Sequence, residues 1–499
     1  MCLSLILDPN TASMFTVLPP PNCATGSLAP YVSSAGAPWN RLRAQHLYRR
    51  MGFGADDATI SADLQENPGD LVDQLIAAMQ SAPILPEPSR ANWTIGDYTD
   101  FGAESTAQFV EYSNTWINAM LSSATKERVV LFWHNHFVTR FEDYFCPSWM
   151  YEYHQLLQNY ALGNFREFVY EMGKNPAMLV YLNGVQNTRF EPNENYAREL
   201  YELFTLGQDN GYTQQDIVET ARALTGWNGF STACAPITFV DILHDTGNKT
   251  IFGQTGNWGY DELHQILFTE RAQEISEHIC GKIYRHFVHP EIDETIVAGL
   301  AQTFRDNDWE LAPVFRQLFK SEHFFDEYVM GTRIKSPLDL MLGTIIEGGF
   351  ANNEDVRNYV LYAGYQLNQG LFNPVDVAGW PGDRDWVNTN TITGRWQSSD
   401  YFIFTNYQAS PQILVALAQA LTTDNANDPA LVTQAIVDYL IPNGLTTPEA
   451  YEAATAVFKW EVPQNYYDSG EWNLYWETVP VQVGLLMQHI SRLPEFQLS

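Results

Sequence analysis

Apolar residues recur at helical spacing along almost the whole chain, and this periodicity limits the fold more than any other feature. In the segment 70–79, Leu71, Val72, Leu75, Ile76 and Met79 fall at intervals of three and four residues. That spacing places side chains on one face of an α-helix. Similar patterns predict helices at about 104–121, 125–137, 149–161, 164–172, 195–206, 213–225, 260–287, 291–306, 309–320, 336–347 and 353–366, followed by a helical block at 408–491.

Two segments depart from the helical period. The stretch 237–243, a polar turn and the stretch 249–252 read as two short strands, which predicts a β-hairpin near 237–252. Residues 370–396 are dense in Gly, Pro, Asn and Trp and predict a long ordered loop. The expected fold is therefore mainly α: a large multi-helix body with one small β-hairpin and long ordered loops.

The chain of 499 residues divides into three regions by composition. Residues 1–37 are rich in Pro and Ser and predict an extended arm. Residues 38–400 form the expected main helical domain, which carries the hairpin. Residues 401–499 form a C-terminal helical block that we expect to pack on the main domain. An arm that docks onto a neighbouring subunit would make the protein a homo-oligomer.

The charge balance excludes some partners. The chain has 59 acidic and 27 basic residues and a formal net charge of -32. Nucleic acids and anionic membranes are bound through basic surfaces, so neither is an expected partner. No stretch approaches eighteen consecutive apolar residues, and no transmembrane segment is expected. The opening run, residues 1–7, lacks a basic segment and is too short for a normal signal peptide.

Five cysteines are widely spaced, at positions 2, 23, 146, 234 and 280. No pair has zinc-ribbon spacing, and the odd number leaves at least one thiol unpaired. One or two disulfides are compatible with the sequence. Cys146 and Cys234 are the more interesting pair because both lie in loop-like sequence, but spacing alone does not give the connectivity.

Two histidines one residue apart lie in an apolar helical segment. On a regular helix, residues two apart point about 200° away from each other, so His134 and His136 would chelate one ion only if the helix ended or unwound at Asn135. Together with Glu199 or Glu202 they would form a ligand set for zinc, manganese or iron. The alternative is that one histidine is a buried hydrogen-bonding residue and the other packs among aromatic rings.

A second polar cluster follows sixty residues later. Glu199 and Glu202 are three residues apart and share a helix face, which suits metal ligands or an acid/base pair. Asn193, Glu194 and Arg198 surround them and are expected to support the catalytic groups. The alternative is a solvated helix face on which Arg198 pairs with its acidic neighbours.

Three tryptophans follow in the predicted loop region. Trp380, Trp386 and Trp396 are candidates for a platform that stacks on sugar rings, and the alternative is a loop packed on its own side chains. The sequence has no nucleophile elbow, phosphate-binding loop, HExxH pair or dinucleotide fingerprint. Serine hydrolases, nucleotide triphosphatases and nicotinamide dehydrogenases are therefore not expected.

The same residues carry a resemblance to a bacterial family, the domain of unknown function 1800. The motifs are residues 49–54 (RRMGFG), 132–137 (FWHNHF), 193–207 (NENYARELYELFTLG), 221–227 (ARALTGW), His244-Asp245 with Lys249 and Gly253, 333–337 (RIKSP), 372–382 (FNPVDVAGWPG) and 493–497 (LPEFQ). The resemblance runs from about residue 40 to the C-terminus. It implies an exported protein, extracellular or periplasmic, with a sulfatase-like protein as a partner.

These observations favour an exported metal-dependent hydrolase or lyase that acts on a polymeric substrate such as a glycan. A divalent ion would lower the pKa of a bound water molecule and supply hydroxide near neutral pH. The alternatives are a non-catalytic cell-surface assembly protein and a glycan-binding module.

Overall fold

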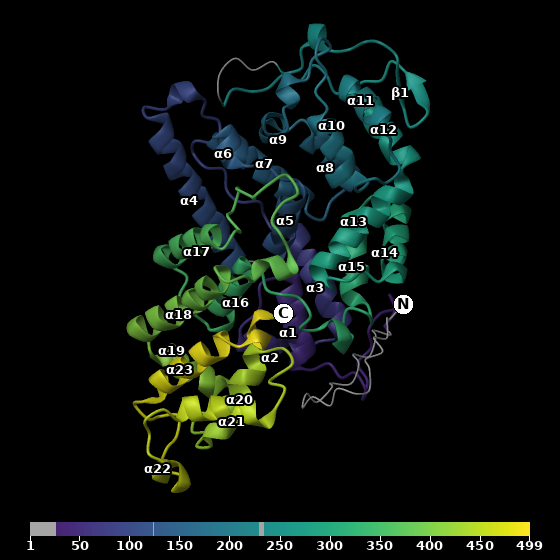
Figure 1. The fold of residues 1–499 in the computed structure, drawn as a ribbon. Helices are drawn as coiled ribbons and strands as arrows, with labels where there is room; N and C mark the ends of the chain where they lie inside the picture. The colour runs from purple at the N-terminus through teal and green to yellow at the C-terminus, as the bar shows by residue number, and fades with distance from the viewer. Residues whose placement is uncertain (1–25, 123, 229–233) are drawn as a thin grey trace, which may run out of the picture.

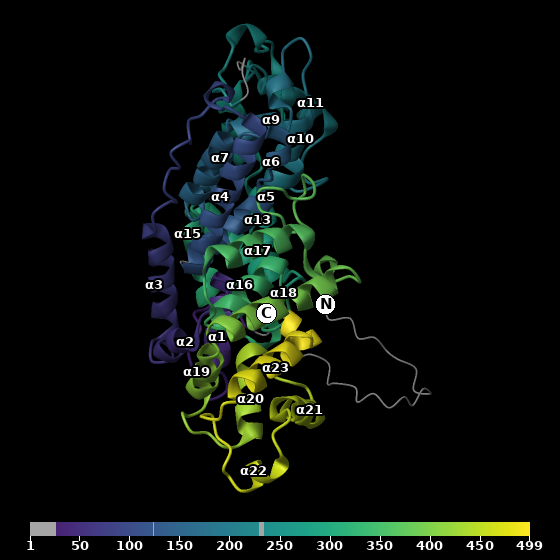
Figure 2. The ribbon, with the colours of Figure 1, turned by 90° about the vertical axis from the view of Figure 1, so that its left-hand side faces the viewer.

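A computed structural model of the chain describes residues 26–122, 124–228 and 234–499. It confirms the mainly α prediction, because the described residues form helices α1–α23 and a single two-stranded sheet. Figures 1 and 2 show a molecule that is longer than it is wide, with the helices arranged around its long axis.

The first half of the chain forms the upper part of Figure 1 and the centre. Its helices are α1 (Arg41–Met51), α2 (Asp57–Asp63), α3 (Pro68–Ser81), α4 (Phe101–Ser122), α5 (Ala124–His136), α6 (Phe141–Tyr144), α7 (Pro147–Tyr160), α8 (Phe165–Met172), α9 (Pro176–Tyr181), α10 (Asn195–Glu199), α11 (Gln214–Ala223) and α12 (Tyr260–Glu270).

The second half completes the centre and forms the lower part of Figure 1. Its helices are α13 (Ala272–Phe287), α14 (Glu294–Asp306), α15 (Leu311–Lys320), α16 (Pro337–Glu347), α17 (Glu354–Gln366), α18 (Thr391–Ala409), α19 (Gln412–Leu421), α20 (Pro429–Leu440), α21 (Pro448–Lys459), α22 (Gln464–Asp468) and α23 (Val479–Ser491). Among the described residues, no helix is long and apolar enough to cross a membrane.

Local sequence signals account for many helix starts. Asn40 caps α1 by accepting a hydrogen bond from the backbone N–H of Arg43 at 3.2 Å. Thr213 and Asp216 form the reciprocal capping box that starts α11. The predicted segment 260–287 is two helices, α12 and α13, which meet at Arg271.

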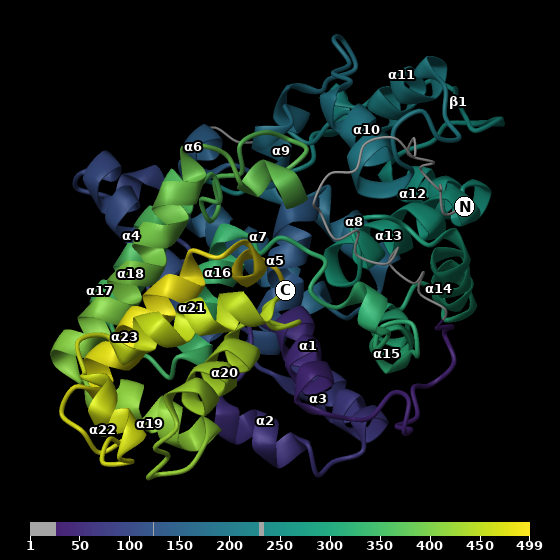
Figure 3. The same cartoon turned by 60° about the horizontal axis from the view of Figure 1, so that its bottom comes forward.

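Helix α5 occupies the centre of the core. Residues 129–133 on it are all buried, with Val129, Val130 and Trp133 fully inaccessible. A helix that is apolar on every side must be surrounded by protein. Figure 3 shows α5 near the middle of the molecule, and α1 packs against it. The predicted histidine pair therefore lies at the end of a helix in the core.

The hairpin is present, but its first strand was assigned to the wrong residues. Strand β1 (Lys249–Ile251) pairs antiparallel with β2 (Gln254–Gly256). Phe252 and Gly253 form the turn, with φ values of 48° and 82°. Two-residue turns of type I′ need positive φ at both positions, and this turn joins β1 to the residues that follow it. The segment 237–243 instead makes an isolated bridge from Phe239 to Trp227 and a short 3₁₀ turn.

The predicted long loop ends earlier in the structure, and a helix crosses the predicted domain boundary. Residues 370–390 form a loop with one 3₁₀ turn, Asp383–Trp386, but α18 begins at Thr391, so Trp396 lies on a helix. Helix α18 also runs across residues 400 and 401, where the C-terminal block was expected to begin. The buried apolar side chains of α19–α23 belong to the same core cluster as those of α5.

The predicted arm lies only partly within the described residues, because residues 1–25 fall outside them. Residues 26–37 pack on their own chain. The backbone N–H of Tyr31 donates to the Lys320 carbonyl at 2.7 Å, and that of Glu322 donates to the Ala29 carbonyl at 2.8 Å. Assembly through the arm stays a prediction.

Candidate functional site

His134 is a neutral, buried histidine with a partner at each ring nitrogen. The Phe372 backbone N–H donates to Nε2 at 3.0 Å, which leaves the ring proton on Nδ1. Nδ1 lies 2.7 Å from the Tyr153 hydroxyl, and that hydroxyl donates to the Phe137 carbonyl at 2.7 Å. Burial lowers the pKa of His134 to about 3. The ring therefore ties the loop at Phe372 to α5 and α7.

His136 points to a different part of the core. Its Nε2 is 3.1 Å from the Phe204 carbonyl, and its buried Nδ1 has no hydrogen-bond partner among the described residues. Burial lowers its pKa well below the usual value, and the cation of Lys282 lowers it further.

The structure does not bring the two histidines together. Helix α5 continues through His136, so the helix does not unwind at Asn135, and the two rings have separate sets of partners. Within the described ranges, no group of three or more His, Cys, Asp or Glu side chains is placed to hold a metal ion. A metal held by His134, His136, Glu199 and Glu202 stays a prediction.

The second predicted cluster lies where α10 changes into a π-helix. The π-helical segment, Leu200–Thr205, follows α10 directly, and π-helical turns are frequent at functional sites. Arg198 donates to Glu194 at 3.1 Å and to Glu202 at 3.2 Å, so these three residues form an ion chain along the helix. Asn193 accepts a hydrogen bond from the backbone of Asn195 at the start of α10.

Glu199 is the one member of this cluster whose carboxylate receives no hydrogen bond from any described residue. It is half-buried, and burial raises its pKa, with a further contribution from the negative charge of Glu202. It also lies within electrostatic range of Tyr181 on α9, a phenol whose pKa is raised to about 12, mainly by burial. A carboxyl group that has a raised pKa, and whose oxygens are not engaged by a hydrogen-bond donor, is suited to donate or accept a proton.

The three tryptophans do not form a common surface in the described structure. Trp380 and Trp386 are each 5% exposed. The backbone N–H of Trp380 donates to the Asn135 side chain at 2.6 Å, and its ring packs against His134. Trp396 is half-buried on α18. The first two rings thus fasten the 370–390 loop to the core, and sugar stacking by the three stays a prediction.

Sequence reasoning missed a cluster of arginines near α1, α5 and α16, beside His286 of α13, whose pKa is lowered well below its usual value by burial and by these arginines. We call Arg50, Arg128, Arg333, His286 and Asp339 the basic centre. Each of the three arginines lies within electrostatic range of the other two, and His286 lies within range of all three. Arg128 forms a salt bridge with Asp339. Arg50 is fully buried, and this burial lowers its pKa well below the usual value, with a further lowering by the neighbouring cations.

A basic face of α13 connects the basic centre to His136. His278, Lys282 and His286 are spaced four residues apart and so share one face. His136 has both His278 and Lys282 within electrostatic range, and the ring of His286 packs on Phe132 of α5. Burial lowers the pKa of Lys282 to about 8. The sequence feature that could have revealed this basic face is the four-residue spacing of its side chains in an apolar segment.

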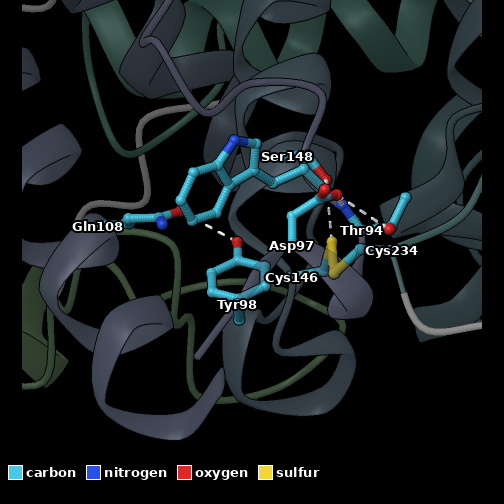
Figure 4. The surroundings of a disulfide bond; sticks show 8 residues. Thr94, Asp97, Tyr98, Gln108, Cys146, Ser148 and Cys234 are labelled. Carbon is cyan, nitrogen blue, oxygen red and sulfur yellow. Dashed lines mark hydrogen bonds between the residues drawn. A yellow bond between two sulfur atoms is a disulfide. The ribbon is translucent and has the colours of Figure 1, made fainter. Parts of the chain in front are cut away.

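A disulfide joins Cys146, at the start of α7, to Cys234 (Figure 4). It closes a loop of 88 residues that contains α10 and α11. The Ser148 hydroxyl lies 3.1 Å from the Cys146 sulfur and donates to the Trp93 carbonyl. Cys280 is a free, buried thiol whose pKa is raised by burial.

The fold and these clusters define a mainly helical protein with buried polar groups on and around α5. The chain belongs to the family described as protein of unknown function DUF1800, whose sequence model matches residues 46–498. No curated protein and no solved structure matches the chain.

Proposed function

We propose that the protein is an exported hydrolase or lyase that acts on a polymeric, glycan-type substrate, with Glu199 as its acid–base group. The observation that carries this proposal is the Glu199 carboxylate. It is half-buried and has a raised pKa, and no described residue hydrogen-bonds to it. Cleavage of a glycosidic bond needs a carboxyl group that stays protonated at a higher pH than an ordinary glutamate.

Two further observations support the proposal. Glu199 sits at the junction between α10 and the π-helical segment, a kind of distortion that is enriched at functional sites. The Cys146–Cys234 disulfide supports export, since structural disulfides form and persist in oxidising compartments.

The test is a comparison of two glutamate variants on a panel of neutral, acidic and sulfated polysaccharides. Hydrolysis is followed by new reducing ends, and lyase activity by the ultraviolet absorbance of unsaturated products. Glu199→Gln is expected to lower the rate at least a hundredfold, since general acid–base groups contribute about 10²–10⁴-fold. Glu171→Gln is the control, because Glu171 lies on α8, outside the predicted cluster, and its carboxylate is paired with Lys174.

Equal activity of Glu199→Gln and the wild type would contradict the proposal. The metal is tested separately by elemental analysis of unchelated protein. An ion that is retained by the wild type and lost in His136→Ala would assign the reaction to a metal-dependent enzyme. Absence of bound metal from both proteins would leave acid–base chemistry at Glu199.

A further inference from the structure

The side chains of the basic centre carry more positive than negative charge. Arg50, Arg128 and Arg333 lie near one carboxylate side chain within the cluster, that of Asp339. Of the nearby acidic groups, Glu347 is already held by Arg49, and Asp383 is a half-buried side chain within electrostatic range of Arg333. A chain with a net charge of -32 has thus gathered three guanidinium groups in its interior.

Several donors of the basic centre have no partner among the described residues. Arg50 uses Nη2 to donate to the backbone oxygen of Ser499 at 2.7 Å and to the Val329 carbonyl at 3.4 Å, while its Nε and Nη1 have no partner among the described residues. The Nε of Arg128 is also unpartnered. No described residue accepts a hydrogen bond from the Arg333 side chain. Buried cations with free N–H groups are strongly disfavoured unless an anion pairs with them.

Part of the basic centre is accessible to solvent. Arg333 and His286 are half-buried, and the Asp339 side chain is 13% exposed. Helix α16 begins at Pro337, four residues after Arg333, and Asp339 in its first turn already takes part in capping its N-terminus. Guanidinium groups match the planar and tetrahedral oxygens of carboxylate, phosphate and sulfate.

We propose that the basic centre is a binding site for a compact oxyanion, which Arg50, Arg128 and Arg333 hold through their unpartnered N–H groups. The shared chemistry is that of a phosphate, sulfate or carboxylate group. The proposal is independent of the reaction proposed for Glu199, because it rests on different residues.

The test is isothermal titration calorimetry of the full-length protein with inorganic phosphate, sulfate and acetate in a chloride-free buffer. The wild type is expected to bind at least one of the three, and Arg333→Gln is expected to bind it at least tenfold more weakly. Arg166→Gln is the matched control, because the Arg166 side chain on α8 is 42% exposed and, among the described residues, forms its ion pair with Asp308 alone. Arg333→Lys keeps the charge and is expected to retain part of the affinity.

Each outcome decides the proposal. A preference for phosphate or sulfate assigns a tetrahedral ligand, and a preference for acetate assigns a carboxylate ligand. Binding that is the same in wild type and Arg333→Gln would show an adventitious surface ion only and would overturn the proposal. Failure of all three anions to bind would also overturn it. Thermal unfolding of each variant checks that the fold is intact, and Arg333→Lys replaces Arg333→Gln if the latter does not fold.

Discussion

The Arg49 guanidinium holds the Glu347 carboxylate through two parallel contacts, Nε to Oε1 at 2.6 Å and Nη2 to Oε2 at 3.1 Å. The side chains are 5% and 4% exposed, and they join α1 to α16. Gly54 lies against the same carboxylate, since a Cβ at this position would be 2.9 Å from Oε1. The motif at residues 49–54 therefore ends in glycine where the chain turns past Glu347.

Removing one partner of this pair should destabilise the protein strongly. Glu347→Ala leaves the Arg49 cation buried and unpaired, which typically costs about 3–5 kcal/mol of unfolding free energy. Urea unfolding measures the loss. Replacing both residues by Met should recover much of it, because two apolar side chains leave no unpaired charge. A loss below about 1 kcal/mol in Glu347→Ala would show that the pair is not isolated from solvent.

The disulfide should raise the free energy of unfolding, because it restricts the conformations of the unfolded chain. It closes a loop of 88 residues, for which chain-entropy arguments give about 4 kcal/mol. The double variant Cys146→Ser/Cys234→Ser is expected to lose roughly that amount, and reductant should lower the stability of the wild type but not of the variant. Cys280→Ala is the control, because its thiol is free and its replacement should leave the response to reductant unchanged.

The buried carboxylate of Glu127 should lower the free energy of unfolding at neutral pH. It is buried on α5, and burial raises its pKa to about 6 despite hydrogen bonds from Trp116 and Gln158. The folded state therefore binds this proton more tightly than the unfolded state, and stability falls as pH rises from 4.5 to 6. Glu127→Gln keeps an acceptor for both donors and should be more stable than the wild type by about 2 kcal/mol at pH 7. Unfolding at pH 4 and pH 7 measures the difference, which should vanish at pH 4.

The buried ring of His264 should have the opposite pH dependence and lower the free energy of unfolding at acidic pH. Its Nδ1 lies 2.9 Å from the Tyr260 carbonyl, and burial lowers its pKa to about 4. Its contribution to the free energy of unfolding is present above pH 6.5 and is lost as pH falls toward 4, because the histidine of the unfolded chain is protonated first. His264→Asn keeps the donor to Tyr260, so the stability of the wild type should fall by about 3 kcal/mol relative to the variant between pH 7 and pH 4. Parallel stability profiles of the two proteins would contradict the buried, neutral ring.

The sequence predicted those parts of the structure that depend on residues close together in the chain, such as helix caps and helix faces. The capping box of Thr213 and Asp216 could be read directly, and the helical repeat already implied that His134 and His136 diverge. The hairpin was misplaced because 237–243 has strand-like composition, whereas the positive φ of Phe252 and Gly253 sets the pairing.

The basic centre could not be predicted, since Arg50, Arg128 and Arg333 come from three distant segments. Only tertiary packing brings their charges together. The motifs at residues 49–54 and 333–337 contain Arg50 and Arg333, but Arg128 lies in neither, and no local pattern indicated that the three meet. The partners of His134 likewise come from α7 and from the loop at Phe372, so its neutral, hydrogen-bonded state follows from packing alone.

The contact between Arg50 and Ser499 has a consequence for how the chain matures. These residues are 449 positions apart, and Leu498 forms a bridge with Ile334 beside them. The centre of the molecule therefore closes only after the segment around Ser499 has been synthesised. Until then, α1 and α5 present arginines without their final neighbours, and nascent chains that lack this segment should stay sensitive to proteases.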